Sequence, residues 1–284
     1  MTEASRCGVD ESRWGVQLRY ACELDRLSPD LRPRFVPSQL DTEGEAFLAA
    51  SLKRKHRRSE LWAHRALTLF VSDFDANAWL GMYPVFLFST PQALALLEAA
   101  RPSGLEQARL LDVGAGSGDV TTRLAPLVES THCTETSRLM ARRLKKRGLP
   151  CWLGRAGEGA PGDPLASGAF DVIALLNVID RASRPRALLA HAALRLPPGG
   201  VLLVSTPLPY EPFFFDGSLT RDPEERLEIR GEGWEEAVSE LWRHELEPLG
   251  LELARLTRLP YLSGGDAQYP AYVLDAAVLV CRKR

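Results

Sequence analysis

The sequence predicts an α/β fold organised around a doubly wound, largely parallel sheet. Over residues 109–127, a short apolar run ends in a glycine-rich turn that leads into helix-like apolar spacing. Strand-like and helix-like segments then alternate as far as residue 205, and two more strand-like segments follow near the C-terminus. Because alternating strands and helices pack as parallel sheets with right-handed crossovers, this pattern indicates one α/β domain over residues 106–284.

The glycine-rich turn predicts a cofactor site. Its strand, 110–113, is apolar except for Asp112, and glycines follow at alternate positions: Gly114, Gly116 and Gly118. Glycine lacks a Cβ, so such a turn can adopt positive φ and let a ligand approach the backbone. A dinucleotide site would carry G-x-G-x-x-G, but Asp119 stands where its last glycine would be. The two carboxylates disfavour a pyrophosphate and suit a cationic ligand, such as the sulfonium and ammonium groups of S-adenosylmethionine (SAM).

The next strand-like segment, 131–135, ends in Glu135. A carboxylate about 20 residues beyond a glycine-rich turn is expected to bind the ribose of a nucleotide. The alternative is a purely structural turn with a carboxylate at the helix N-terminus and no ligand. The register of strand, glycines and distal acid favours the cofactor site.

Composition excludes several classes of protein. The 284 residues are 45% hydrophobic and 25% charged, as in ordinary globular proteins, and the net charge of −2 provides no general attraction to nucleic acid. No apolar run reaches the roughly 18 to 20 residues that span a bilayer, and residues 1–10 lack a secretory signal. The five cysteines form no C-x-x-C pair, and no Cys/His/Asp cluster has metal-ligand spacing. We expect an intracellular, cytoplasmic monomer without a metal.

Residues 1–105 are predicted to form a largely helical extension that packs on the core. One helix follows Asp41, an amphipathic helix spans 61–70, and a third begins at Ser89 or Thr90 with Pro91 in its first turn. The basic run 53–58 could bind nucleic acid, but a solvated helix face explains it more simply. The aromatic side chains between residues 77 and 91 are expected to pack on the core, with one or two facing the ligand.

The predicted elements of the α/β domain can be placed in order. Strands are expected at 131–135, 151–153, 170–176, 201–205, 250–257 and 272–282, and helices at 120–127, 137–147, 185–196 and 234–249. An insertion at about 206–231 is long enough to be functional. The segment 259–270 is expected to be a loop that closes the last two strands as a hairpin.

Ligands of open α/β sheets bind beyond the carboxyl ends of the strands. Asn177 and Asp180 follow the fourth strand and therefore belong near the glycine-rich turn. Methyl transfer from a sulfonium is an in-line displacement, which needs the acceptor to be oriented and unprotonated. Asp180 could accept an N–H from the acceptor, or it could pair locally with Arg181 at a helix N-terminus. The spacing alone leaves both readings open.

Several motifs outside the glycine-rich turn carry a resemblance to a known family. The sequence resembles the DREV, or methyltransferase-like protein 9, family of protein-histidine N-methyltransferases from about residue 77 to the C-terminus. The matching segments are 80–89 (LGMYPVFLFS), 111–119 (LDVGAGSGD), 134–135 (TE), 177–181 (NVIDR), 227–236 (LEIRGEGWEE), 257–262 (TRLPYL) and 272–278 (YVLDAAV).

The resemblance implies a Rossmann-like, seven-stranded class I SAM-dependent methyltransferase fold with an N-terminal helical extension. It implies methylation of a histidine ring nitrogen in His-x-His motifs of protein substrates, with S-adenosylhomocysteine as the other product. The predicted cofactor site comprises Asp112, Gly114, Gly116, Gly118, Glu135 and Asn177. The predicted catalytic residues are Asp180, Asn177 and Tyr272, and the predicted substrate-binding residues are Asp180, Arg181, Tyr210, Phe213 and Tyr272.

Two departures and two alternatives accompany this hypothesis. Ser117 stands where the family commonly has an aspartate, and the segment 210–215 has its own order of aromatic residues. The first 75 or so residues match the family poorly. A small-molecule methyltransferase that acts on an imidazole dipeptide, or a SAM-fold module without catalysis, would share the same glycine-rich turn.

Overall fold

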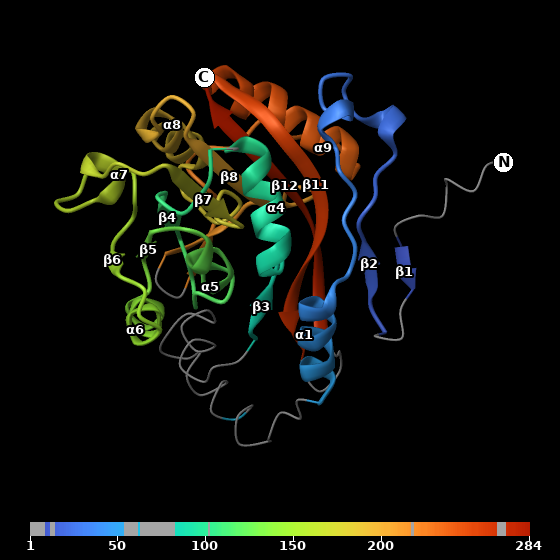
Figure 1. The fold of residues 1–284 in the computed structure, drawn as a ribbon, viewed down its shortest axis with the longest axis horizontal. Coiled ribbons are helices and arrows are strands. Elements are labelled where there is room, and N and C mark those ends of the chain that lie inside the picture. Colours follow the sequence, from blue (N-terminus) through green and yellow to red (C-terminus); the bar gives the residue numbers. More distant parts are fainter. Residues whose placement is uncertain are drawn as a thin grey trace.

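The computed structural model describes residues 9–11, 15–53, 62, 83–101, 103–216, 219–265 and 271–284. Their main feature is an eight-stranded sheet with the order β3-β11-β12-β8-β7-β4-β5-β6 (Figure 1). The strands are β3 (Val85–Phe86), β4 (Arg109–Val113), β5 (Ser130–Glu135), β6 (Cys151–Leu153), β7 (Val172–Leu176), β8 (Val201–Pro207), β11 (Leu251–Gly264) and β12 (Ala271–Lys283). Strands β4 to β8 run parallel to one another, and β12 is antiparallel to both β8 and β11.

The sheet confirms the doubly wound prediction. The chain moves outward from β4 through β5 to β6, then returns to the other side of β4 with β7 and β8. The order therefore reverses between β4 and β7, and such a switch point is where ligands bind in α/β sheets. Seven of the strands are those predicted. The eighth strand, β3, was not predicted. Its residues Val85 and Phe86 pair with the edge of β11.

Helices cover both faces of the sheet. Helix α4 (Thr90–Ala100) lies on one face, whereas α8 (Pro185–Arg195) and α9 (Trp234–Glu240) cover the other (Figure 1). The remaining helices are α1 (Thr42–Lys53), α5 (Thr121–Leu124), α6 (Arg138–Lys146) and α7 (Pro164–Ser167). The predicted helix 234–249 continues beyond α9 as a π-helical turn, Leu241–Leu246, and a 3₁₀ turn, Glu247–Leu249.

Helix α4 begins as predicted. The Ser89 hydroxyl accepts a hydrogen bond from the backbone N–H of Gln92 (3.2 Å), and the Gln92 side chain accepts one from the backbone N–H of Ser89 (3.0 Å). Pro91 occupies the first turn, where its missing N–H costs nothing. This capping box fixes the point at which the chain leaves β3 and enters the helix.

The prediction of a largely helical N-terminal part is wrong for residues 15–40. Strand β2 (Gln17–Arg19) pairs with β1 (Val9–Glu11), and the chain continues in extended form with short 3₁₀ turns at Leu24–Arg26 and Arg32–Arg34. Prolines at 29, 33 and 37 oppose a continuous helix, because each removes a backbone donor. The amphipathic helix predicted at 61–70 and most of the basic run 53–58 lie outside the described residues.

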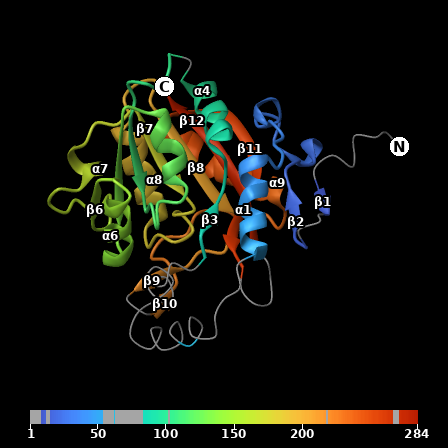
Figure 2. The same cartoon turned by 60° about the horizontal axis from the view of Figure 1, so that its bottom comes forward.

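The insertion after β8 forms a small separate hairpin of β9 (Phe214–Asp216) and β10 (Leu219–Arg221). Figure 2 shows this hairpin beyond the end of the main sheet. The predicted loop 259–270 is wrong for its first half, because β11 continues as a strand to Gly264. The hairpin between β11 and β12 is confirmed.

A buried ion cluster ties the extended N-terminal segment to the sheet. The guanidinium of Arg258, on β11, is bonded to the Asp275 carboxylate on β12. It also donates to the carbonyl of Ala21 (3.1 Å) and to Glu235 of α9 (3.4 Å). Glu235 in turn accepts the backbone N–H of Glu23 (3.0 Å). Since Arg258 is only 7% exposed, its loss would leave buried carboxylate charge without a counter-ion.

We expect Arg258→Ala to lower the free energy of unfolding by about 3 kcal/mol, the usual result of removing one partner of a buried ion pair. Urea denaturation followed by circular dichroism measures this change. Arg34→Ala is the control, because Arg34 pairs with Glu252 at the surface, where both side chains are about half exposed. Equal midpoints for the two variants would contradict a structural role for the cluster.

Candidate active site

The glycine-rich turn after β4 has the backbone conformation that the sequence predicts. Gly114, Gly116 and Gly118 have φ values of 68°, 56° and 80°, all in the region that favours glycine. A Cβ on Gly114 would lie 2.7 Å from Val178 Cγ2, in the loop after β7. A Cβ on Gly118 would lie 2.7 Å from Leu144 Cδ2 of α6. The turn therefore packs directly against its neighbours on both sides of the switch point.

Glu135 fastens this turn to the end of β5. Its Oε2 accepts the N–H of Gly116 (2.9 Å), and its Oε1 accepts the N–H groups of Thr136 (2.7 Å) and Ser137 (2.9 Å). Burial raises the pKa of Glu135, while these backbone donors oppose the shift. A carboxylate oxygen can accept two hydrogen bonds. Within the described chain Oε2 accepts one, which leaves capacity for a ligand hydroxyl.

The two aspartates around the turn differ in the groups that compensate their charge. Asp112 is buried, and its Oδ2 accepts the Thr121 hydroxyl (2.5 Å), whereas its Oδ1 has no partner within the described chain. Burial raises the pKa of Asp112 to about 7, despite the Thr121 hydrogen bond. Asp119 instead pairs with Arg147 (2.7 Å) and accepts the Val85 N–H (3.3 Å). We expected both carboxylates to face a cationic ligand, but Arg147 already balances the charge of Asp119.

The loop after β7 begins with a strained residue. Asn177 has a φ of 52°, which is unusual for a residue other than glycine. Its backbone N–H donates to the Ser205 carbonyl (2.9 Å), and its side-chain oxygen accepts the Ser205 hydroxyl (2.6 Å). Its side-chain Nδ2 is buried with no partner among the described residues. Strain held by neighbouring strands is common at functional sites.

Asp180 lies in the same loop and is only 3% exposed. Its Oδ2 pairs with Arg181 Nη1 at 2.8 Å, while its Oδ1 is buried and has no partner in the described part of the chain. Burial raises the pKa of Asp180, and the positive charge of Arg181 opposes that shift. The structure thus combines both readings of the sequence, because the local ion pair with Arg181 uses one oxygen and leaves the other for a ligand.

The insertion after β8 forms a wall around Asp180. The Tyr210 hydroxyl donates to the Ile179 carbonyl (3.0 Å), and the Phe213 N–H donates to the Asp180 carbonyl (3.0 Å). The Arg181 guanidinium lies over the Phe213 ring, 3.8 Å from its centroid. The structure therefore brings three predicted substrate-binding residues together around Asp180. The polar contacts of Tyr210 and Arg181 within the described residues are made to the protein itself.

Tyr272 lies on the other side of the predicted site, at the start of β12. Its side chain is 41% exposed and contributes to a groove of about 390 Å³. The other lining residues come from the β2 region and the late hairpin: Val16, Gln17, Arg19, Pro260, Ala271, Val273 and Asp275. The placement of Tyr272 as a catalytic or acceptor-site residue stays a prediction.

Sequence reasoning missed Tyr261, on β11. It stands opposite Leu274 in the hairpin, and Ser263 stands opposite Tyr272, so the alternation of a strand puts Tyr261 and Tyr272 on one face. Burial raises the pKa of Tyr261, and the charges of Asp180 and Asp119 add to the shift. The phenol is therefore within electrostatic reach of both the glycine-rich turn and the loop after β7. Tyr261 belongs to the segment 257–262 that carried the family resemblance, and this was the available signal.

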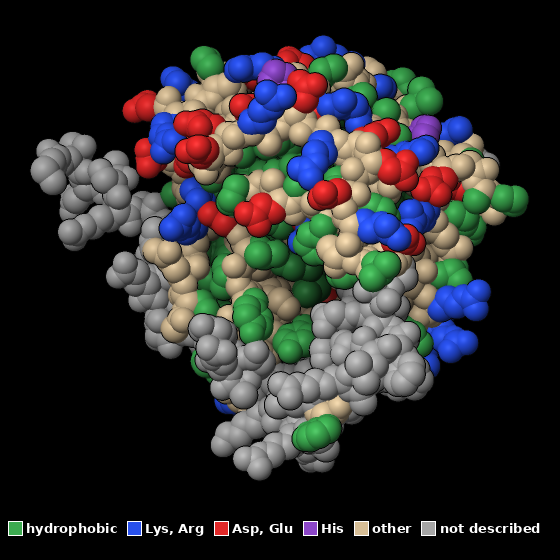
Figure 3. Space-filling model, turned by 180° about the vertical axis from the view of Figure 1, so that it is seen from behind, with side chains coloured by type: hydrophobic (Ala, Val, Ile, Leu, Met, Phe, Trp, Pro, Cys, Tyr) green, Lys and Arg blue, Asp and Glu red, His purple; other side chains and the backbone are tan. Residues whose placement is uncertain are grey.

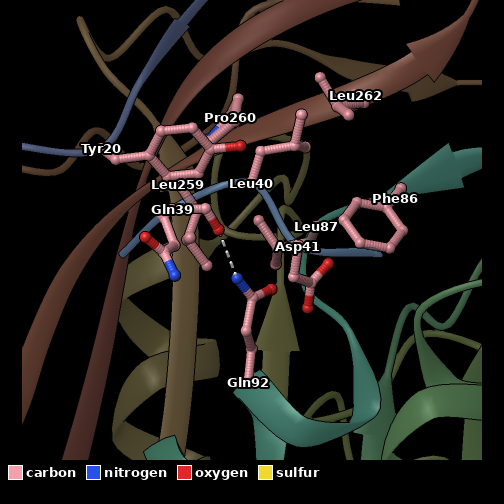
Figure 4. Close-up of a pocket in the computed structure, with 10 residues that line it drawn as sticks. All are labelled: Tyr20, Gln39, Leu40, Asp41, Phe86, Leu87, Gln92, Leu259, Pro260 and Leu262. Atoms are coloured by element: carbon pink, nitrogen blue, oxygen red, sulfur yellow. Dashed lines mark hydrogen bonds between the residues drawn. The ribbon is translucent and has the colours of Figure 1, made fainter. Parts of the chain in front are cut away.

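Other surface features do not form competing sites. A second hollow, where β3, β11 and the start of α4 meet, has no internal volume, and the Gln92 side chain there donates to the Gln39 carbonyl at 2.9 Å (Figure 4). On the face in Figure 3, acidic and basic side chains alternate over the upper part, and hydrophobic side chains gather in a hollow below them. In the described ranges, no group of three His, Cys, Asp or Glu residues could hold a metal, and no helix is long and apolar enough to cross a membrane.

A model of the DREV methyltransferase family matches residues 19–283. The chain belongs to this family. The match begins well before residue 77, so our expectation that the first 75 or so residues resemble the family poorly is wrong. The glycine-rich turn and the doubly wound sheet are accordingly those of a Rossmann-like class I methyltransferase, and SAM is the cofactor.

Solved structures with a similar fold include several that bind SAM or its product. The N-methyltransferase NodS from Bradyrhizobium japonicum WM9 is 15% identical over 68% of this chain and 94% of its own, with a TM-score of 0.42. Magnesium protoporphyrin IX methyltransferase from Synechocystis PCC 6803 with bound SAM is 11% identical over 88% and 100%, with a TM-score of 0.45. The [4+2]-cyclase SpnF is 16% identical over 68% and 80%, with a TM-score of 0.44. At these values, nothing about the substrate of the DREV methyltransferase follows.

The residues around the switch point fit a ligand of this kind. Three of the buried polar atoms that lack partners in the described part of the chain are Asp112 Oδ1, Asn177 Nδ2 and Asp180 Oδ1. They lie at the carboxyl ends of β4 and β7, beside the glycine-rich turn. Buried polar groups are normally satisfied, so these atoms indicate binding partners that the described residues do not supply. Asp112, Glu135 and the glycine-rich turn would hold the cofactor.

We expect Gly114→Ala to weaken SAM binding by about tenfold or more, because a left-handed alanine costs roughly 1 to 2 kcal/mol and its methyl group would displace Val178. Isothermal titration calorimetry measures the affinity. The control is Gly159→Ala, which has a φ of 72° and no atom within 4 Å of the added Cβ. Unchanged SAM affinity in Gly114→Ala would show that SAM binding does not need the close approach of Gly114 to Val178.

Proposed function

We propose that this methyltransferase transfers a methyl group from SAM to a ring nitrogen of histidine in His-x-His motifs of protein substrates. The observation that carries the proposal is the buried Oδ1 of Asp180 at the switch point, which has no partner among the described residues. A carboxylate there requires a ligand group that donates a hydrogen bond and gains positive charge during the reaction. Neutral imidazole meets both requirements, because it carries one N–H and one lone pair.

The chain's own residues would orient the acceptor as follows. Asp180 Oδ1 accepts the N–H of the imidazole, which selects one tautomer and points the other nitrogen away from the carboxylate. Methylation makes the ring cationic, and the fixed negative charge of Asp180 stabilises that charge as it develops. SAM supplies the methyl group as an electrophile. The N–H proton stays on the ring nitrogen, hydrogen-bonded to Asp180, and passes to solvent after the ring is released.

The amide of Asn177 supports this arrangement. Ser205 holds its side-chain oxygen, which fixes the orientation of the amide, and Nδ2 is buried with no partner among the described residues. It can bind an acceptor group of SAM or of the peptide, in line with its predicted role in both sites. Removal of its amide would leave the Ser205 hydroxyl without that partner.

Exposed side chains on the face of the hairpin that carries Tyr261 support a polypeptide substrate. Tyr272 and Leu274 share this face and are 41% and 43% exposed. A peptide that extends beyond its target histidine can use such an open surface, whereas a small imidazole compound would be expected to bind beneath a lid. The sequence contains no His-x-His motif, so self-methylation at such a motif is not expected.

We expect Asp180→Asn to lower kcat by about a hundredfold through loss of the negative charge, with the SAM dissociation constant nearly unchanged. Initial rates with a His-x-His peptide and calorimetry with SAM measure the two quantities. Asp216→Asn is the matched control, because Asp216 is an exposed carboxylate of the same region, paired with Arg221. Near wild-type rates in Asp180→Asn would refute the proposed mechanism.

Substrate class is tested with peptides in which each histidine is replaced by alanine, and with an imidazole dipeptide in parallel. We expect methylation of the His-x-His peptide and loss of it in the alanine peptides, located by mass spectrometry. Faster methylation of the imidazole dipeptide than of the peptide would instead identify a small-molecule methyltransferase. SAM binding without methylation of either the peptide or the dipeptide would favour the third hypothesis, a SAM-fold module without catalysis.

A further inference from the structure

We propose that Arg181 is a positioning residue for this reaction: stacked on Phe213, its guanidinium keeps the Asp180 carboxylate ionised and turned so that Oδ1 is presented to the acceptor. This inference rests on the proposed function, and it assigns to the insertion after β8 a part in controlling the carboxylate. Direct binding of the substrate by Arg181 and Phe213 stays a prediction, and the experiment below distinguishes it from the positioning role.

The geometry fixes the guanidinium from several directions. Arg181 Nη1 lies 2.8 Å from Asp180 Oδ2 and donates to the Asp180 carbonyl at 2.9 Å and the Glu211 carbonyl at 3.4 Å. The guanidinium lies 3.8 Å from the centroid of Phe213, a distance typical of a cation–π contact. A cation held by an ion pair, two carbonyls and a ring has little freedom to turn elsewhere.

The insertion holds the ring in place. Phe213 packs edge-on against Phe215, with ring centroids 5.5 Å apart and an interplanar angle of 87°. The Phe213 N–H donates to the Asp180 carbonyl at 3.0 Å. The backbone of Phe213 is therefore hydrogen-bonded to Asp180, and the side chain of Asp180 is the one that pairs with Arg181. Movement of the insertion would alter both contacts together.

The electrostatics give Arg181 a specific task. Burial alone raises the pKa of Asp180 and favours its neutral form. The groups that face the carboxylate are Arg181 on its own loop, Tyr210 from the segment after β8, and Tyr261 from β11. Burial also raises the pKa values of both tyrosines, so their phenols stay neutral at the pH of the reaction. The charge of Arg181 is thus the largest effect that opposes protonation, and the backbone N–H of Asp180 adds a smaller one.

The direction of the pH effect follows. The reaction needs ionised Asp180, so activity is lost as pH falls through the pKa of this carboxyl group. Without the Arg181 cation that pKa rises, and the acid limb of the kcat/KM profile moves to higher pH. This profile reports the free enzyme and the free peptide, whose imidazole has an ordinary pKa of about 6.5 and titrates identically with every variant. A difference between variant profiles therefore reports on the enzyme.

The experiment compares Arg181→Gln, Arg181→Lys and Arg155→Gln with the wild-type chain. Arg155 is the matched control, because its guanidinium lies over the neighbouring ring of Phe214, at 5.6 Å, and the pair does not include Asp180. We measure kcat and KM for the His-x-His peptide across neutral and alkaline pH, and SAM affinity by calorimetry. Carbon NMR of the labelled Asp180 carboxyl follows its titration directly.

We expect Arg181→Gln to move the acid limb of kcat/KM and the Asp180 titration upward by about one pH unit, which is about a fivefold loss at the original midpoint and about a tenfold loss well below it. The rate should recover at alkaline pH, SAM affinity should be unchanged, and Arg181→Lys should restore part of the effect. Arg155→Gln should match the wild type.

Two outcomes would overturn the inference. A loss of rate that is equal at every pH would indicate a structural role, and a rise in KM with an unchanged pH profile would indicate direct peptide binding. If the wild type methylates no histidine peptide, the proposed function fails by itself. The Asp180 titration would then still decide whether Arg181 controls the carboxylate.

Discussion

The close packing between the turn after β4 and the loop after β7 is the constraint on which the site depends. Gly114 and Val178 approach so closely that a single methyl group cannot fit between them. The two loops therefore keep a fixed separation, and Asp112 and Asp180 are brought to the same edge of the sheet. Both carboxylates are buried at this edge. Burial of their charge costs free energy unless a ligand or a cation compensates it.

Different groups compensate the buried negative charge of each carboxylate. Glu135 is stabilised by backbone N–H groups, Asp119 by Arg147, and Asp180 by Arg181. Asp112 has only the Thr121 hydroxyl, and burial raises its pKa accordingly. A cationic cofactor placed beside Asp112 would favour the ionised form of that carboxyl group.

Much of the fold could be predicted because buried parallel strands are continuous apolar runs, and their turns carry distinctive residues. The 110–113 and 172–176 runs are of this kind, and Ser89 and Pro91 mark the start of α4. The meeting of Asn177 with the glycine-rich turn followed from the rule that ligand sites lie at the carboxyl ends of strands. That rule places residues at an edge, but it does not orient their side chains. The pairing of Arg147 with Asp119 therefore could not be foreseen.

The late hairpin shows where local signals mislead. Pro260 and the glycines near residue 264 are typical of a loop, so β11 was expected to end near Thr257. Antiparallel pairing with β12 and β3 extends the strand to Gly264, and this pairing is a tertiary effect that no local window contains. Tyr261 was missed for this reason. The two-residue strand β3 is also too short to show any periodicity.

Strand β3 has a consequence for how the protein can be divided. Val85 and Phe86 pair with β11, the Val85 N–H reaches Asp119, and the Pro84 carbonyl accepts the Gly264 N–H. A fragment that starts at the first strand of the cofactor-binding core would lack all of these contacts. Its β11 would present a bare row of amides and carbonyls, which invites pairing with a second molecule. Excision of the core would thus produce a chain prone to self-association rather than a minimal catalyst.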